Sequence, residues 1–235
     1  MTNLIIGLGC SFTQGEGCDP NRNPDVEITR AYPQLIANKL NWDCVNHAEL
    51  GQGSRTQALR LLTTDVSNYD NVVVIYQQTG GERFDWNELT HNQIHASTRF
   101  ADQHEWDGQY TEQRDYTEQL HNLLQIQTWC KANSAQLIVW SAYDPLTTRH
   151  QLTEYFSEHF DNFDKLIELD NWWLIDNDPD LTLYDYFLDN LGDEYKWYVD
   201  DNTPIKANGD PNDFHPSELG HRWIAEQLIK QIRYI

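Results

Sequence analysis

Short apolar runs alternate with longer amphipathic segments along most of this chain. The apolar runs are bounded by Gly, Asp, Asn or Pro, which is typical of buried parallel strands. The run at 71–79 (NVVVIYQQT) is the clearest, with four β-branched residues in a row. The predicted strands cover 3–9, 42–48, 71–79 and 135–145.

The amphipathic segments predict helices at 30–40, 54–66, 115–132 and 218–232. Ser54 has Gln57 three positions later, a capping-box spacing that predicts Ser54 as an N-cap. Ser217 is the expected N-cap of the last helix. The predicted core faces are Leu120, Leu123, Leu124 and Cys130 in the third helix, and Ile224, Leu228 and Ile232 in the last.

This alternation predicts an α/β fold, a three-layer α/β/α sandwich around a mostly parallel sheet. We expect one domain over 1–235, with excursions at about 84–115 and 161–210. The second excursion is acidic and aromatic and is expected to contain a short strand near 172–175. Its aromatic residues could line a carbohydrate site or pack on one another. Ligands of such sheets bind at the carboxyl ends of the strands.

Composition restricts the partners. The formal net charge is −21, with 23 Asp and only six Lys, so the surface repels phosphate and argues against nucleic acid and anionic membranes. No apolar run is long enough for a membrane span, and no signal peptide is recognisable, so a cytoplasmic location is expected. The four cysteines lack metal-ligand spacing, and no metal is expected. Cys44 and Cys130 are predicted to be buried.

Candidate chemistry lies at the predicted strand ends. Ser11 follows the first strand, Gly51 follows the second, and His215 precedes the last helix. A serine nucleophile needs a histidine base, an orienting partner for that base, and donors for the oxyanion, and these residue types meet those needs. Cys10 is a rival nucleophile whose expected role is packing.

Three other residues in or near these segments are also interpreted. Thr13 is interpreted as a turn residue, and Asn46 as a strand-end residue that holds the following turn. His221 is interpreted as a surface or structural residue.

Three short motifs resemble the SGNH or GDSL-like hydrolases, esterases of flavodoxin-like fold. GCSFTQGEG (9–17) is similar to their first block and implies Ser11 as nucleophile. NHAELGQGS (46–54) is similar to the second, which implies Gly51 in the oxyanion hole, and HPSELGH (215–221) to the last, which implies His215 as base. The GCSFTxG start resembles a branch found in phage and marine bacterial genomes.

The chain departs from the family pattern at two places. The third block normally ends in Gly-x-Asn-Asp, and here Thr79 stands about where its Asn donor would be, with Gln78 or Arg83 as substitutes. The family's Asp three residues before the histidine is Asn212 here, and Asp213 lies one residue closer. We expect Asp213 to orient His215, with Asn212 as the alternative.

The resemblance implies a serine esterase that cleaves an O-acyl ester on a small molecule or glycan, with a glycan O-acetyl group as one candidate, and without cofactor or metal. The alternative is an SGNH-fold binding protein of weak or no activity, such as a phage accessory binder of a glycan or host factor in the virion or host cell. An α/β-hydrolase is excluded by the order of the residues. A nucleotide-binding fold lacks a phosphate cradle, and the oligomeric state is left open.

Overall fold

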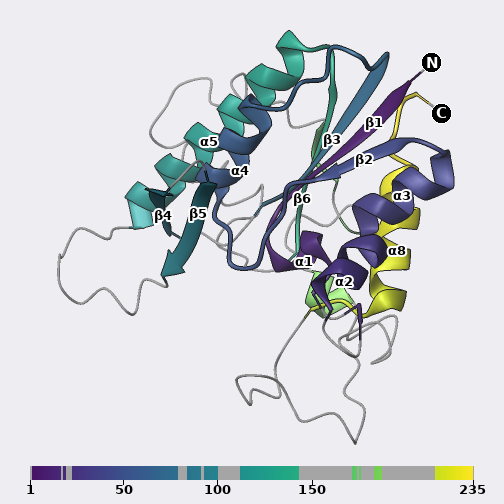
Figure 1. The fold of residues 1–235 in the computed structure, drawn as a ribbon, viewed down its shortest axis with the longest axis horizontal. Helices are drawn as coiled ribbons and strands as arrows, with labels where there is room; N and C mark the ends of the chain where they lie inside the picture. Colours follow the sequence, from purple (N-terminus) through teal and green to yellow (C-terminus); the bar gives the residue numbers. More distant parts are fainter. Residues whose placement is uncertain are drawn as a thin grey trace, which may run out of the picture.

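The computed structural model describes residues 2–16, 18–19, 23–78, 84–90, 93–99, 112–142, 171–173, 175, 183–186 and 215–234. Its centre is a parallel sheet in the order β2-β1-β3-β6, drawn in Figure 1. The strands are β1 (Asn3–Leu8), β2 (Asp43–Asn46), β3 (Asn71–Gln78) and β6 (Gln136–Ser141). All four lie within predicted strands, because each is a short apolar run that the sheet buries.

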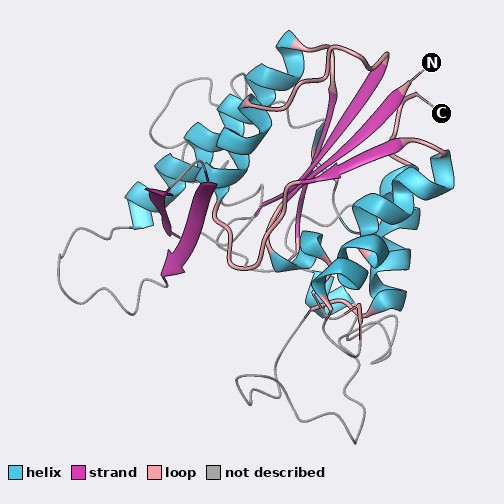
Figure 2. Cartoon of the chain, in the orientation of Figure 1, coloured by secondary structure: helices cyan, strands magenta, loops and turns pink. Residues whose placement is uncertain are grey.

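Helices cover both faces of this sheet (Figure 2). On one face lie α3 (Tyr32–Leu40) and α8 (Glu218–Ile229), and on the other lie α4 (Ser54–Leu62) and α5 (Glu112–Ala132). The predicted three-layer α/β/α arrangement is therefore confirmed. None of the described helices combines the length and the apolar character that a membrane crossing needs.

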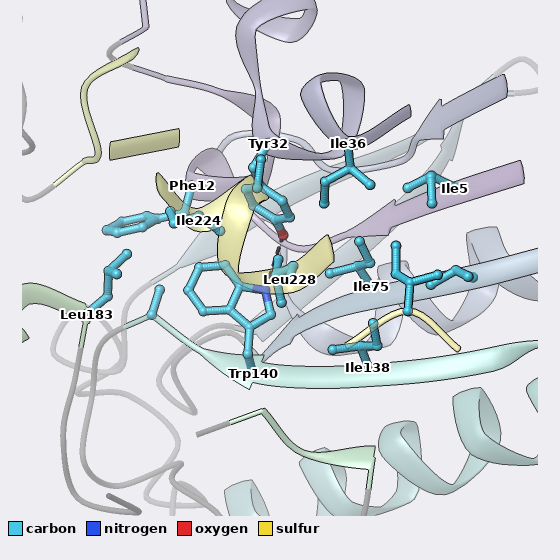
Figure 3. Packing of buried hydrophobic residues seen from close by; sticks show 14 of the residues in the cluster. Ile5, Phe12, Tyr32, Ile36, Ile75, Ile138, Trp140, Leu183, Ile224 and Leu228 are labelled. Carbon is cyan, nitrogen blue, oxygen red and sulfur yellow. Dashed lines mark hydrogen bonds between the residues drawn. The ribbon is translucent and has the colours of Figure 1, made fainter. Parts of the chain in front are cut away.

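Side chains alternate between the two faces of each strand, so the sheet divides the core into two layers. Leu4, Ile6 and Leu8 of β1 pack toward α4 and α5, whereas Ile5 packs toward α3 and α8. Figure 3 shows the second layer, where the indole N–H of Trp140 donates to the Tyr32 hydroxyl at 3.3 Å. The expected core residues of α8 are buried there as predicted, namely Ile224, Leu228 and the following Ile232.

Helix starts were predicted with mixed success. The Ser217 hydroxyl accepts from the Gly220 N–H, which confirms the N-cap of α8. Ser54 is wrong as an N-cap: Gly53 holds that position, and the Ser54 hydroxyl instead accepts from Asn122 of α5 at 2.8 Å. The Gln57 side chain is buried and makes no hydrogen bond to a described residue, so the capping box does not form.

Two short helices between β1 and α3 were not predicted. These are α1 (Ser11–Gln14) and α2 (Pro24–Arg30). The N-cap of α2 is Asn23, whose side chain accepts from the Asp25 N–H, and Pro24 fits the first helical position. The predicted helix at 30–40 therefore begins later, at Tyr32.

The two expected excursions are only partly described. The first contains an antiparallel hairpin of β4 (Phe84–Thr90) and β5 (Gln93–Arg99), and α5 begins inside it at Glu112. In the described part of the second, a parallel bridge joins Trp172 to Val139 where a short strand was expected, and α7 (Leu183–Tyr186) follows.

Of the two cysteines predicted to be buried, Cys130 is buried and Cys44 is half-buried. The difference arises because Cys44 lies on β2, the edge strand of the sheet.

Candidate active site

The nucleophile turn joins β1 to α1 at the carboxyl edge of the sheet. Cys10 is the N-cap of α1, and its carbonyl accepts from the N–H groups of Thr13 and Gln14 at 2.9 Å each. Ser11 is the first helical residue and is only 2% exposed. Cys10 is fully buried, which confirms its predicted packing role.

Ser11 and His215 meet although they lie at opposite ends of the chain. The Ser11 Oγ is 2.7 Å from the His215 Nε2, within hydrogen-bond distance. The Phe12 ring packs on the imidazole with a centroid distance of 4.7 Å. His215 lies two residues before Ser217, the N-cap of α8.

A buried network holds the turn against β3. The Gln77 Oε1 accepts from the Thr13 hydroxyl at 2.8 Å and lies 3.4 Å from the Cys10 N–H. Thr13 was interpreted as a turn residue, which is wrong: it lies within α1 with its hydroxyl fully buried. Gly9 leaves the necessary space, because a Cβ there would lie 1.9 Å from the Thr13 Oγ1.

Asn46 connects the same turn to the loop after β2. Its Nδ2 donates to the Thr13 carbonyl at 2.7 Å, and its Oδ1 accepts from the Ala48 N–H at 3.2 Å. The predicted role of Asn46 in holding this turn is confirmed. Gly51 lies further along the same loop with φ 71°, a backbone conformation that favours glycine. Its function as an oxyanion donor stays a prediction.

Glu16 joins the site without having been singled out from the sequence. Gly15 is the C-cap of the short helix α1 with a φ of 102°, and the Glu16 N–H donates to the Ser11 carbonyl at 3.0 Å. This turn places the Glu16 carboxylate 3.2 Å from the His215 Nε2. The signal in the sequence was the second Gly of GCSFTQG, which permits the left-handed turn.

His221 lies six residues after His215, in the first turn of α8, and is fully buried. Its Nδ1 accepts from the Tyr32 N–H at 3.2 Å. Burial, with a smaller contribution from His215, lowers the pKa of His221 to about 3, so this imidazole is neutral. Of the surface and structural roles proposed for His221, the structural one is confirmed.

Several predicted site residues lie outside the described residues, namely Thr79, Arg83, Asn212 and Asp213. Gln78 is described, and it does not serve as a substitute donor beside Ser11. Its side chain points to the opposite face of the sheet from Gln77 and donates to Gln119 of α5 at 2.7 Å. Within the described segments, no three His, Cys, Asp or Glu side chains are grouped as metal ligands.

The fold is shared with solved esterase structures over nearly the whole chain. A lipase/acylhydrolase from Enterococcus faecalis is 13% identical with a TM-score of 0.51, and the match covers 99% of this chain and 95% of that one. A member of the lipolytic G-D-S-L family from Veillonella parvula is 13% identical with a TM-score of 0.50, and the match covers all of both chains.

A carbohydrate esterase structure gives a similar match. This family two carbohydrate esterase from Clostridium thermocellum, in complex with cellohexaose, is 15% identical with a TM-score of 0.50. The match covers 98% of this chain and 63% of that one. No protein-family model and no curated protein sequence matches this chain. At these identities the likeness establishes the fold, and the α/β fold expected from the SGNH resemblance is confirmed.

Proposed function

We propose that this protein is a serine ester hydrolase of the SGNH or GDSL type. The observation that carries the proposal is the 2.7 Å contact between the Ser11 Oγ and the His215 Nε2. That contact gives a serine hydroxyl the base that it needs to become a nucleophile. Its position at the carboxyl edge of a parallel sheet is where ligands of such folds bind.

In the proposed reaction the Ser11 Oγ attacks the acyl carbon of an ester while the His215 Nε2 takes the hydroxyl proton. The imidazolium then gives that proton to the leaving alcohol, and a water molecule activated by the same histidine hydrolyses the acyl-enzyme. Asp213, or Asn212 in its place, would orient the imidazole. This chemistry requires neither a metal nor a cofactor.

The oxyanion would be held by the N–H groups of Ser11 and Gly51, with the Thr79 hydroxyl as a third donor. The first N–H groups of a helix have no partner inside it, which leaves that of Ser11 at the start of α1 able to donate to a ligand. The φ of 71° at Gly51 allows a backbone orientation that other residues rarely adopt.

The proposed substrate is an O-acyl ester, with an acetyl group on a glycan as the leading candidate. The support is that the fold is shared with a family two carbohydrate esterase solved in complex with cellohexaose. Small-molecule esters remain the second substrate class, because lipase and acylhydrolase structures share the fold equally.

A binding protein without hydrolytic activity is the second candidate. It is favoured by Thr79, which stands where the related esterases carry an Asn that donates to the oxyanion. Loss of one such donor costs roughly a hundred- to a thousand-fold in rate.

Hydrolysis of p-nitrophenyl acetate separates the two candidates. We expect Ser11→Ala and His215→Asn each to lower kcat/KM by about a thousand-fold or more, and Ser67→Ala, at an exposed serine, to leave it unchanged. A fluorophosphonate should label Ser11 in the wild-type protein, as located by peptide mass. Turnover equal in wild type and Ser11→Ala, together with no label, would refute the esterase and favour the binder.

A further inference from the structure

Two oxygen atoms compete for one nitrogen of His215. The Nε2 that lies 2.7 Å from the Ser11 Oγ also lies 3.2 Å from the Glu16 Oε2. The two side chains are 21% exposed at Glu16 and 17% at His215, so water screens their interaction only in part. Among the described residues, the Glu16 Oε2 has no hydrogen-bond partner besides this ion-pair contact.

The protonation state of His215 decides whether this contact is favourable. When the proton is on Nδ1, the Nε2 lone pair accepts the Ser11 hydroxyl proton and faces a negatively charged oxygen, which is repulsive. When Nε2 also carries a proton, the ring is positive and both nearby oxygens attract it. The Glu16 carboxylate therefore favours the imidazolium over the neutral imidazole.

We propose that Glu16 is a positioning residue that stabilises the protonated form of His215, the form that arises when Ser11 gives up its proton. The inference rests on the proposed function for its catalytic meaning. Glu16 contacts the histidine on the side of the nucleophile, whereas Asp213 or Asn212 is proposed to orient the same ring from elsewhere. With Asp213 as the orienting residue, the site would contain two carboxylates that act on the base.

Stabilising the imidazolium also affects the free enzyme before it binds substrate. A carboxylate that favours imidazolium keeps more of the resting His215 protonated, and a protonated histidine does not act as a base. The acidic limb of activity should therefore lie at higher pH in the wild-type protein than in a variant without the carboxylate.

Among the described residues, Glu16 is the only carboxylate within ion-pair distance of the His215 ring. From α1 the contacts are the Ser11 hydroxyl and the Phe12 ring. From α8, His221 is neutral because burial lowers its pKa, and Glu218 is paired with Arg30 and Arg222. Asp213 precedes His215 by two residues and lies outside the described part of the chain.

The test is the pKa of His215 measured by NMR from its ring resonances, which the spectrum of His215→Asn identifies. We expect Glu16→Gln to lower that pKa by about 1 unit, and Glu16→Asp to give an intermediate value. Glu226→Gln removes the same charge at an exposed position of α8 and should leave the pKa unchanged. The acidic limb of kcat/KM should move with the pKa, and circular dichroism verifies that each variant is folded.

A His215 pKa that is the same in Glu16→Gln and in Glu226→Gln would overturn the proposal, as would a higher one. The NMR titration needs no turnover, so the two proposals can fail separately. A protein that lacks Ser11-dependent hydrolysis but shows the pKa change refutes the esterase alone. Ser11-dependent hydrolysis without the pKa change refutes the role of Glu16 alone.

Discussion

β3, α4 and α5 each contribute a buried glutamine. Gln78 of β3 donates to the Gln119 Oε1 of α5 at 2.7 Å. Gln57 of α4 lies one turn after Ser54, which contacts the same helix α5. Gln57 is fully buried, and within the described part of the chain neither of its amide atoms has a hydrogen-bond partner. Replacement of Gln57 by methionine should therefore stabilise the protein.

The magnitude follows from the unpaired atoms. A buried polar group without a partner costs about 1–3 kcal/mol, and methionine has nearly the same length and no polar amide. Gln57→Met should raise the free energy of unfolding by about 1–3 kcal/mol. Gln119→Met is the matched control, because it removes one unpaired atom, leaves the Gln78 Nε2 unpaired instead, and loses the hydrogen bond. Gln119→Met should lower the free energy of unfolding by about 0.5–1.5 kcal/mol.

Urea unfolding followed by tryptophan fluorescence measures both changes. An increase in the free energy of unfolding for Gln57→Met and a decrease for Gln119→Met would support the assignment of unpaired amide atoms at Gln57. A destabilised Gln57→Met, with a loss similar to that of Gln119→Met, would refute it. The amide would then have a partner such as a buried water molecule, which typically bonds otherwise unpaired buried groups.

Three further predictions concern the turn and α8. Thr13→Val removes the donor to Gln77 and should lower the free energy of unfolding by about 1–3 kcal/mol in urea unfolding; a change under about 0.5 kcal/mol, as at surface sites, would contradict the network. Ser217→Ala should cost about 0.5–2 kcal/mol in the same assay, whereas Ser217→Asn should retain most of the cap. The pKa of His221 is about 3 in the folded protein against 6.5 ordinarily, so its neutral form contributes stability above pH 6.5 that is lost as the pH falls toward 3. His221→Asn should show a smaller decrease of Tm between these pH values, and an equal decrease would contradict the assignment.

The parallel sheet could be predicted because its strands carry their own signal. Val74 and Ile75 are both apolar although they face different layers, because both faces of β3 are covered. Ser11 and His215 could also be predicted to meet, because each stands next to an element whose end was recognisable. The same reasoning placed Asn46 correctly at the end of β2.

Contacts that depend on tertiary packing could not be predicted in this way. Ser54 satisfies every local rule for an N-cap, yet its hydroxyl bonds to Asn122, far along the chain. Gln77 is a polar residue of the kind found at strand ends, and its side chain accepts the hydrogen bond from Thr13 that holds α1. Glu16 reaches His215 only because a left-handed residue turns the chain back after one helical turn.

The distance between Ser11 and His215 also depends on hydrogen bonds between other residues of the site. Thr13, two residues after the nucleophile, is held through its hydroxyl by Gln77 of β3 and through its carbonyl by Asn46 of β2. Because the strands on both sides of β1 hold this residue, a shift of α1 would break at least one of the two hydrogen bonds. A change of about 1 Å in such a constellation is enough to cost two orders of magnitude in rate. The rigidity of the strand ends is therefore part of the candidate catalytic machinery, and the amides of Gln77 and Asn46 are as necessary to its geometry as the two residues in contact.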